Sequence, residues 1–193
     1  MMVRSFRSVL AEQCAPTLMS LKAASMFRWQ DPKQSSDEIR SCAAELRDMG
    51  LSMRVLKVCH RTNAALFYVY SAPELQRVLS NPETQAFLMQ AGYDMEGDLP
   101  AVLRQLSGRL CLEGAFPHEI GVFLGYPLED VIGFIENNGR NYTCVGCWKA
   151  YGDPCSAQAR FDAYHRCTEY CRSVFSPEMP LAHFSAAAQA ACA

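Results

Sequence analysis

The chain has 193 residues and a formal net charge of −2, with 50% hydrophobic and 20% charged residues. This composition is typical of a globular protein that can bury a substantial core. Residues 1–100 carry 11 basic and 11 acidic side chains, and residues 101–193 carry 7 and 9. Neither half has the basic excess that nucleic-acid binders normally show, so a nucleic-acid partner is not expected.

The sequence contains no run of about 18–20 apolar residues, the length that a membrane-spanning helix needs. Its first residues, MMVRSFRSVLAEQCAP, begin with basic side chains but lack the apolar stretch of a signal peptide. We therefore expect a cytoplasmic protein with no membrane partner. Its ten cysteines are then expected to be thiols or metal ligands, because disulfides are rare in the cytoplasm.

The N-terminal region, residues 3–28, has helical patterning in two pieces that break at Cys14. Pro16 suits the first turn of the second piece, and the apolar face of that piece would consist of Leu18, Leu21 and Met26. A thiol at a helix start is favoured as a thiolate by the exposed amides and the helix dipole. Two interpretations of Cys14 stay open: a reactive or ligating cysteine, or a half-buried thiol at a helix boundary.

The next helix is predicted to begin after Ser35, which has capping-box spacing to Glu38, and to end at Gly50. Two strands with strong β composition follow at residues 51–59 and 64–71, joined by a turn that contains His60. The second strand is apolar on both faces, so we expect it to be central in its sheet.

Three further helices are predicted from proline and N-cap signals, beginning at Pro73, at Pro82 after the cap Asn81, and after the cap Asp98. An amphipathic helix is predicted over residues 156–175. We expect a single domain over residues 1–175 and a poorly ordered tail over residues 176–193.

The stretch from residue 117 to 138 predicts a corner of two short helices that meet at Gly125. Such a corner is also found in DNA-binding helix-turn-helix units, but the second helix carries Glu129, Asp130 and Glu136 and no basic residue. DNA binding is therefore disfavoured. His118 and Glu119 would lie in the first turn of the corner, where His118 is either a ligand or proton carrier or a packing contact.

A strand is predicted over residues 141–149, and it would complete a small sheet with the two earlier strands. The fold class is therefore expected to be α+β, with a small, mostly antiparallel three-stranded sheet covered by several helices.

Cys144 and Cys147 in the third predicted strand have the spacing of half a zinc or iron site. A second pair is available at Cys167 and Cys171, which lie four residues apart on one helix face. The alternatives are thiol redox chemistry at Cys144 and Cys147, or inert buried thiols.

Four stretches of the sequence resemble a known family: CAPTL, LFYVYSAPELQRVL, FPHEIGVFLGYPLEDVIGFIENNGRNY and WKAYGD. They are similar to the bacterial domain-of-unknown-function family numbered 3793, which is found mainly in anaerobes. The resemblance implies an intracellular protein of an anaerobe, with Cys14 and Trp148-Lys149 as part of the family pattern. The family pattern more often has an aromatic residue at position 147. The resemblance implies no particular activity.

Three functional hypotheses follow from these features. The first is a ligand-, metal- or cofactor-binding protein of anaerobic metabolism, with zinc or iron as the candidate metal. Its site would combine the strand at 142–151, including Trp148 and Lys149, with five further side chains: Cys14, Lys22, His118, Glu119 and Tyr126.

The second hypothesis is a thiol-dependent enzyme with Cys14 as nucleophile and His118 or His60 as base. The third is a protein-interaction module that uses the 117–138 helix corner.

Overall fold

The computed structural model describes residues 5–112, 116–176 and 178–184. By its packing the chain divides into two compact units, and the expected single domain over residues 1–175 stays a prediction. Unit 1 comprises Met1–Ala72 and Tyr164–Ala193, and unit 2 comprises Pro73–Ala163. Helical and strand periodicity identifies buried faces but does not say which elements pack together, so this division is not visible in the sequence.

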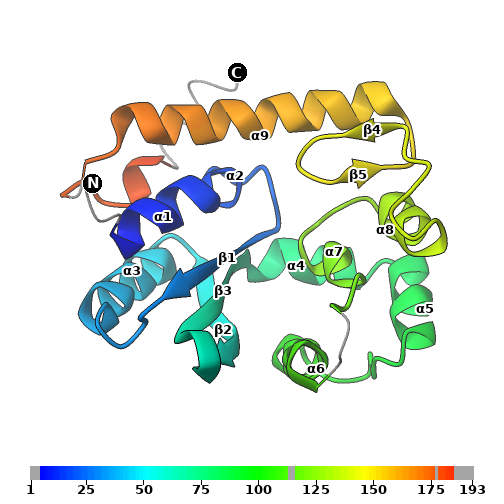
Figure 1. The fold of residues 1–193 in the computed structure, drawn as a ribbon, viewed down its shortest axis with the longest axis horizontal. Helices are drawn as coiled ribbons and strands as arrows, with labels where there is room; N and C mark the ends of the chain where they lie inside the picture. Colours follow the sequence, from blue (N-terminus) through cyan, green and yellow to red (C-terminus); the bar gives the residue numbers. More distant parts are fainter. Residues whose placement is uncertain (1–4, 113–115, 177, 185–193) are drawn as a thin grey trace. The chain divides into compact units, whose positions relative to one another are not determined.

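Unit 1 is built on a three-stranded antiparallel sheet of order β1-β3-β2 (Figure 1). The strands are β1 (Ala24–Gln30), β2 (Leu51–Cys59) and β3 (Ala64–Ser71), and a short 3₁₀ turn at His60–Thr62 joins the last two. The predicted strands 51–59 and 64–71 are therefore confirmed, and β3 is central as expected. The fold class α+β is also confirmed.

The prediction that residues 141–149 form the third strand of this sheet is wrong. The position of that strand is taken by β1, which lies within the region 3–28 that we expected to be helical. Helical structure there ends with α1 (Phe6–Gln13) and the short α2 (Ala15–Leu18). Met26, expected on a helix face, instead pairs with Tyr68 of β3. Residues 24–30 are extended because they pair with the edge of β3, and a local sequence pattern cannot reveal such a distant partner.

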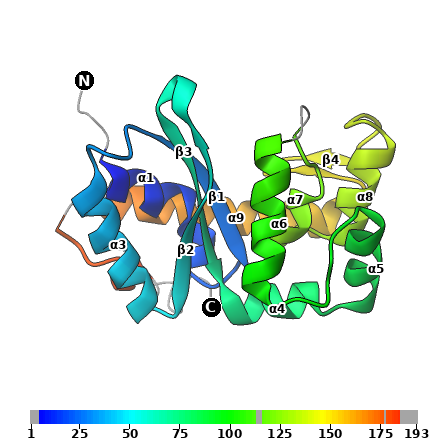
Figure 2. The ribbon, with the colours of Figure 1, turned by 90° about the horizontal axis from the view of Figure 1, so that it is seen from below.

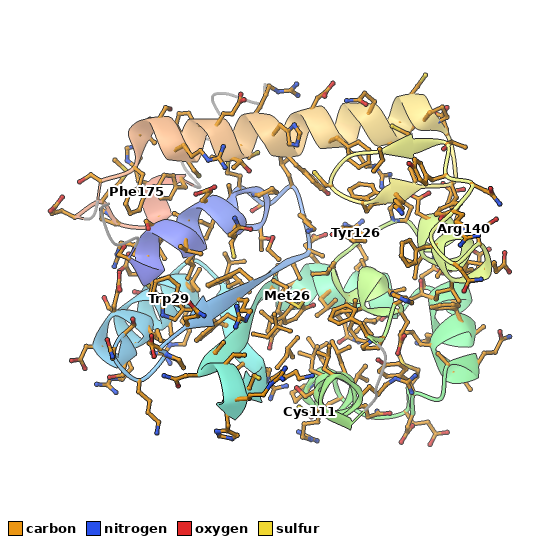
Figure 3. All side chains as sticks on the ribbon, in the orientation of Figure 1. Met26, Trp29, Cys111, Tyr126, Arg140 and Phe175 are labelled. Carbon is orange, nitrogen blue, oxygen red and sulfur yellow. The ribbon has the colours of Figure 1, made fainter. Side chains whose placement is uncertain are left out.

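The core of unit 1 contains a cluster of aromatic rings between the sheet and the helices. Phe6 of α1 contacts Phe67 at 4.9 Å between ring centroids, Phe27 at 5.5 Å and Trp29 at 5.6 Å. Figure 2 shows α1 and α3 (Ser36–Asp48) on the same side of the three strands, and Trp29 is labelled on β1 in Figure 3. Burying the rings of Phe6, Phe27 and Phe67 contributes about 1.5–3 kcal/mol each.

The predicted N-cap and end of α3 are confirmed, but its capping box does not form. Ser35 occupies the N-cap without a side-chain cap bond, and its hydroxyl instead accepts from Trp29 Nε1 at 3.2 Å. The Glu38 carboxylate accepts from the backbone N–H groups of Phe6 at 3.1 Å and Arg7 at 3.0 Å. Ser35 and Glu38, which the local pattern pairs with each other, thus bind groups from other elements of unit 1 instead. Gly50 follows the helix with a φ of 74°.

Residues 178–184, expected to belong to a poorly ordered tail, pack into the core of unit 1. Leu181 and Phe184 are completely buried. Glu45 of α3 accepts from the backbone N–H of Leu181 at 2.9 Å and forms an ion pair with Arg7. Arg7 also donates to the carbonyl of Met179 at 3.2 Å. The packed chain therefore extends beyond residue 175, and residues 185–193 lie outside the described part.

Unit 2 contains α4 (Ala72–Leu79) apart from its first residue, α5 (Pro82–Gln90), α6 (Leu99–Leu112), α7 (Ile120–Phe123) and α8 (Leu128–Glu136). A two-stranded hairpin of β4 (Cys144–Val145) and β5 (Lys149–Ala150) follows, and then the first part of α9 (Pro154–Val174). The predicted caps are confirmed, since Asn81 and Asp98 side chains accept from backbone N–H groups of α5 and α6. No helix in the described residues is both long and apolar enough to cross a membrane.

Candidate ligand-binding site

The connection between α7 and α8 positions Tyr126, one of the predicted ligand-binding residues. Gly125 has a φ of 73°, a conformation that favours glycine, and the N–H of Tyr126 donates to the carbonyl of Gly121 at 2.9 Å. The helix corner expected at 117–138 is thus present. Its first helix begins at Ile120, so His118 and Glu119 lie in the turn before α7 rather than within the helix.

Asp130 of α8 organises the surroundings of this connection. The residue is only 4% exposed, and its carboxylate accepts three hydrogen bonds. Oδ1 accepts from the N–H groups of Tyr151 at 2.6 Å and Gly152 at 3.0 Å, and Oδ2 accepts from Trp148 Nε1 at 2.7 Å. We expected Asp130 on an acidic surface. The structure buries it because the hairpin brings three donors to its two oxygens.

Trp148 joins the Tyr126 connection to α9. Its ring stacks on Tyr126 at 4.7 Å between centroids and meets Phe161 of α9 edge-on at 4.5 Å. With its N–H held by Asp130, the indole has contacts on its face, its edge and its polar atom. Such a ring has little freedom to rotate, so the position of Tyr126 is fixed by a rigid neighbour.

Tyr151 packs closely against Gly133 of α8. A Cβ atom at Gly133 would lie 2.4 Å from the Tyr151 ring, so only glycine allows this contact. Within the described residues the buried Tyr151 hydroxyl has no hydrogen-bond partner. Removal from water, together with the nearby Asp130 carboxylate, raises the pKa of this phenol. The phenol is therefore expected to stay protonated at neutral pH.

Glu119, predicted to bind ligand, is engaged by protein groups. Its Oε1 accepts from Arg109 Nε at 2.7 Å and from the Tyr93 hydroxyl at 3.2 Å, and its side chain is 8% exposed. The Arg109 guanidinium also lies over the Tyr93 ring, 5.0 Å from its centroid. This pairing gives Glu119 a structural role in holding the turn before α7 to α6.

Two other predicted residues, His118 and Lys149, meet at a shared aromatic ring. The His118 ring lies 4.9 Å from that of Phe134, and Lys149 Nζ lies 5.9 Å from the Phe134 centroid and 5.1 Å from that of Tyr142. Lys149 also donates to the carbonyl of Gly139 at 2.7 Å, where α8 ends. The described contacts of His118 and Lys149 are therefore with other protein groups, and the Lys149 hydrogen bond secures the end of α8.

An open groove of about 340 Å³ lies beside the Tyr126 connection. It is lined from α4, α5 and the α7–α8 corner by Arg77, Val78, Asn81, Glu83, Thr84, Val122, Tyr126 and Leu128. All of these residues belong to unit 2. Four of these eight residues are polar or charged, so the groove offers hydrogen-bonding and charged groups beside an apolar wall, as a small-molecule site does.

Cys14 and Lys22, the remaining predicted site residues, belong to unit 1, whereas His118, Glu119 and Tyr126 belong to unit 2. Cys14 is completely buried between α1 and α2, and burial strongly raises the pKa of its thiol. Lys22 Nζ lies 5.9 Å from the centroid of the Tyr164 ring. The helix-start effect that would favour a thiolate is thus outweighed by desolvation, which favours the neutral thiol.

The four cysteines predicted as metal ligands fall into two pairs with different surroundings. Cys167 and Cys171 are buried in the core of unit 1, and burial raises the pKa of Cys171 to about 12. Cys144 and Cys147 lie in the hairpin of unit 2, where Cys147 is exposed. Within the described residues, no group of three or more His, Cys, Asp or Glu side chains is arranged to hold a metal ion, and no disulfide is formed.

Sequence reasoning missed Asp130 as a buried organiser and four groove residues, Arg77, Asn81, Glu83 and Thr84. A signal for Asp130 was present, because it lies four residues before Phe134 and so shares its face of α8. The groove residues carried no comparable signal, since they come from separate helices that only the tertiary fold brings together.

The family model for proteins of unknown function (DUF3793) matches residues 10–184. The chain belongs to this family. The match ends at Phe184, the last described residue of the packed C-terminal segment, so it includes both units. No curated protein and no solved structure shows significant similarity to the chain.

Proposed function

We propose that the protein binds a small molecule in the groove of unit 2, beside Tyr126. The observation that carries this proposal is the combination of an open groove of about 340 Å³ with a wall residue that is held in place. Tyr126 stacks on Trp148, and Trp148 is fixed by Asp130 and Phe161. Preorganised walls of this kind reduce the entropy lost when a ligand binds.

The enzyme hypothesis with Cys14 as nucleophile receives less support. A nucleophilic thiol needs access to its substrate and a depressed pKa, whereas Cys14 is completely buried and its pKa is raised. The metal hypothesis lacks a cluster of three ligands within the described chain. A location in the cytoplasm of an anaerobic bacterium stays a prediction of the sequence, which cell fractionation of the source organism checks.

A screen of small fragments by ligand-observed NMR tests the proposal. Leu128→Trp introduces a larger side chain at the groove wall, and Met89→Trp introduces the same side chain at a residue of α5 that is 61% exposed and does not line the groove. Fragments that bind the wild-type protein should lose binding to Leu128→Trp and keep it with Met89→Trp. Circular dichroism establishes that both variants are folded. Equal binding to all three proteins would show that the groove is not the site.

A further inference from the structure

The groove of unit 2 carries one positive and one negative side chain, Arg77 of α4 and Glu83 of α5. The ion-pair partner of Arg77 is Glu74, three residues earlier on the same helix. Both side chains of that pair are exposed, at 78% and 45%, so the pair contributes little and can exchange for a ligand. A guanidinium has five N–H donors, which leaves capacity for a carboxylate even with Glu74 in place.

Glu83 is the negatively charged side chain of the groove lining. Its backbone N–H is bound by the Asn81 side chain at 2.9 Å, but within the described residues its carboxylate has no ion-pair or hydrogen-bond partner. Asn81 also accepts from the N–H of Thr84 at 3.2 Å. The cap thus occupies two amides that would otherwise attract an anion to the start of α5, so Arg77 is the cationic side chain in the groove lining.

Thr84 supplies a further polar group in the groove. The residue is only 5% exposed, and in the described part of the chain its hydroxyl makes no hydrogen bond. Its place in the groove lining makes it available to a bound molecule.

The charges of the groove restrict the ligand. An anion without a positive group would bring negative charge close to Glu83, and a cation without a negative group would bring positive charge close to Arg77. A neutral apolar molecule would pair with neither charge. A molecule that carries both charges pairs each of them.

We propose that the groove binds a small zwitterion with an apolar side chain, of the chemical class of a free α-amino acid. Its carboxylate pairs with Arg77, its ammonium group pairs with Glu83, and its side chain packs on the apolar wall formed by Val122, Tyr126 and Leu128. A groove of about 340 Å³ lies at the lower end of the volumes typical of ligand sites, which suits a molecule of this size. The inference rests on the proposed function.

Calorimetric titration with three matched probes tests this ligand class. L-Phenylalanine, 3-phenylpropionate and 2-phenylethylamine have similar apolar parts, but only the first carries both charges. The expected affinity for L-phenylalanine is about twofold to fivefold above that for the other two, because each of them leaves one exposed charge of the groove unpaired. A leucine series (L-leucine, 4-methylpentanoate and 3-methylbutylamine) repeats the comparison with a smaller side chain.

Two variants test which group of the ligand pairs with each charged side chain of the groove. Arg77→Met should weaken the amino acid and the carboxylate probe by about twofold to fivefold, without weakening the amine. Glu83→Gln should weaken the amino acid and the amine, and should strengthen the carboxylate probe because the repulsion is removed. Arg104→Met, at an exposed residue of α6 outside the groove lining, is the matched control and should bind like the wild type.

The outcomes separate this inference from the proposed function. If the singly charged probes bind as tightly as the amino acids in both series, the zwitterion class is wrong. It is equally wrong if neither amino acid binds while other fragments bind in a way that Leu128→Trp abolishes, and the proposed function then stands. If no fragment shows that dependence on Leu128, the proposed function fails, and the inference fails with it.

Discussion

Replacing Asp130 with alanine is expected to destabilise unit 2 by about 3–5 kcal/mol, the range found when a buried polar network is broken. The residue is 4% exposed, and its carboxylate accepts from Trp148 Nε1 at 2.7 Å and from two backbone N–H groups of the following segment. A hydrogen bond to a charged group contributes about 1.5–3 kcal/mol, and three donors would lose their acceptor together. Their contributions are not additive, so the total lies below their sum.

Asp130→Asn should cost less, about 1–3 kcal/mol. The asparagine carbonyl can still accept from the N–H groups of Tyr151 and Gly152, but its NH₂ group would then face the Trp148 N–H, and two donors cannot pair. The order of stability is therefore expected to be wild type, then Asp130→Asn, then Asp130→Ala.

Urea denaturation followed by Trp148 fluorescence measures these differences. The chain has two tryptophans, and Trp29 lies in unit 1, so a Trp29→Phe background makes the signal specific to unit 2. A separate signal is needed because two units can unfold in separate transitions. Glu136→Gln, at an exposed acidic residue of the same helix, is the control. An Asp130→Ala variant within about 0.5 kcal/mol of this control would refute the assigned role of Asp130.

Gly133→Ala should destabilise unit 2 by about 1–3 kcal/mol, because the added Cβ would lie 2.4 Å from an aromatic ring. Gly108→Ala in α6 has nothing within 4 Å of its Cβ and should stabilise unit 2 by about 0.5–1 kcal/mol. Thermal melts of the two variants test both expectations. The ion pair with Arg7 lowers the pKa of Glu45 below the usual 4.5. The contribution of this pair to stability is therefore complete above pH 4.5 and disappears as the solution becomes more acidic. The stability difference between wild type and Glu45→Gln should accordingly shrink as urea titrations move from pH 6 toward pH 3, and a constant difference would contradict the assignment. Native Cys14 should react with a thiol reagent about a hundredfold or more slowly than exposed Cys147, as peptide mass spectrometry would show, and equal rates would disprove its burial.

The confirmed predictions concern features whose causes are close in sequence. Asn81 caps α5 by accepting from N–H groups two and three residues later, and Gly50 follows α3 in a left-handed conformation that few other residues adopt. The hairpin of β2 and β3 likewise joins adjacent segments of strong β composition. In each case the interacting groups lie within one short segment, so the local pattern contains the information.

The predictions that differ from the structure depend on distant partners. The segment at 24–30 is extended because it pairs with β3, about forty residues later in the register of Phe27 with Phe67. The capping box at Ser35 and Glu38 is replaced by bonds to Trp29 and to the start of α1. Local patterning did not fail to detect these side chains. It assigned them to the nearest available partner, and the folded chain provided a different one.

The sequence by itself determined the α+β class, most helix ends, two of the three strands of the sheet and the membership of the family, because these depend on local periodicity, capping and motif identity. Tertiary structure alone decided the burial of Asp130 and the existence of the groove. The Asp130 carboxylate is buried because Trp148, 18 residues away in the chain, donates to it. The groove exists because α4, α5 and the α7–α8 corner present their side chains to one space. Such convergence is a property of packing between elements, and no single segment contains it.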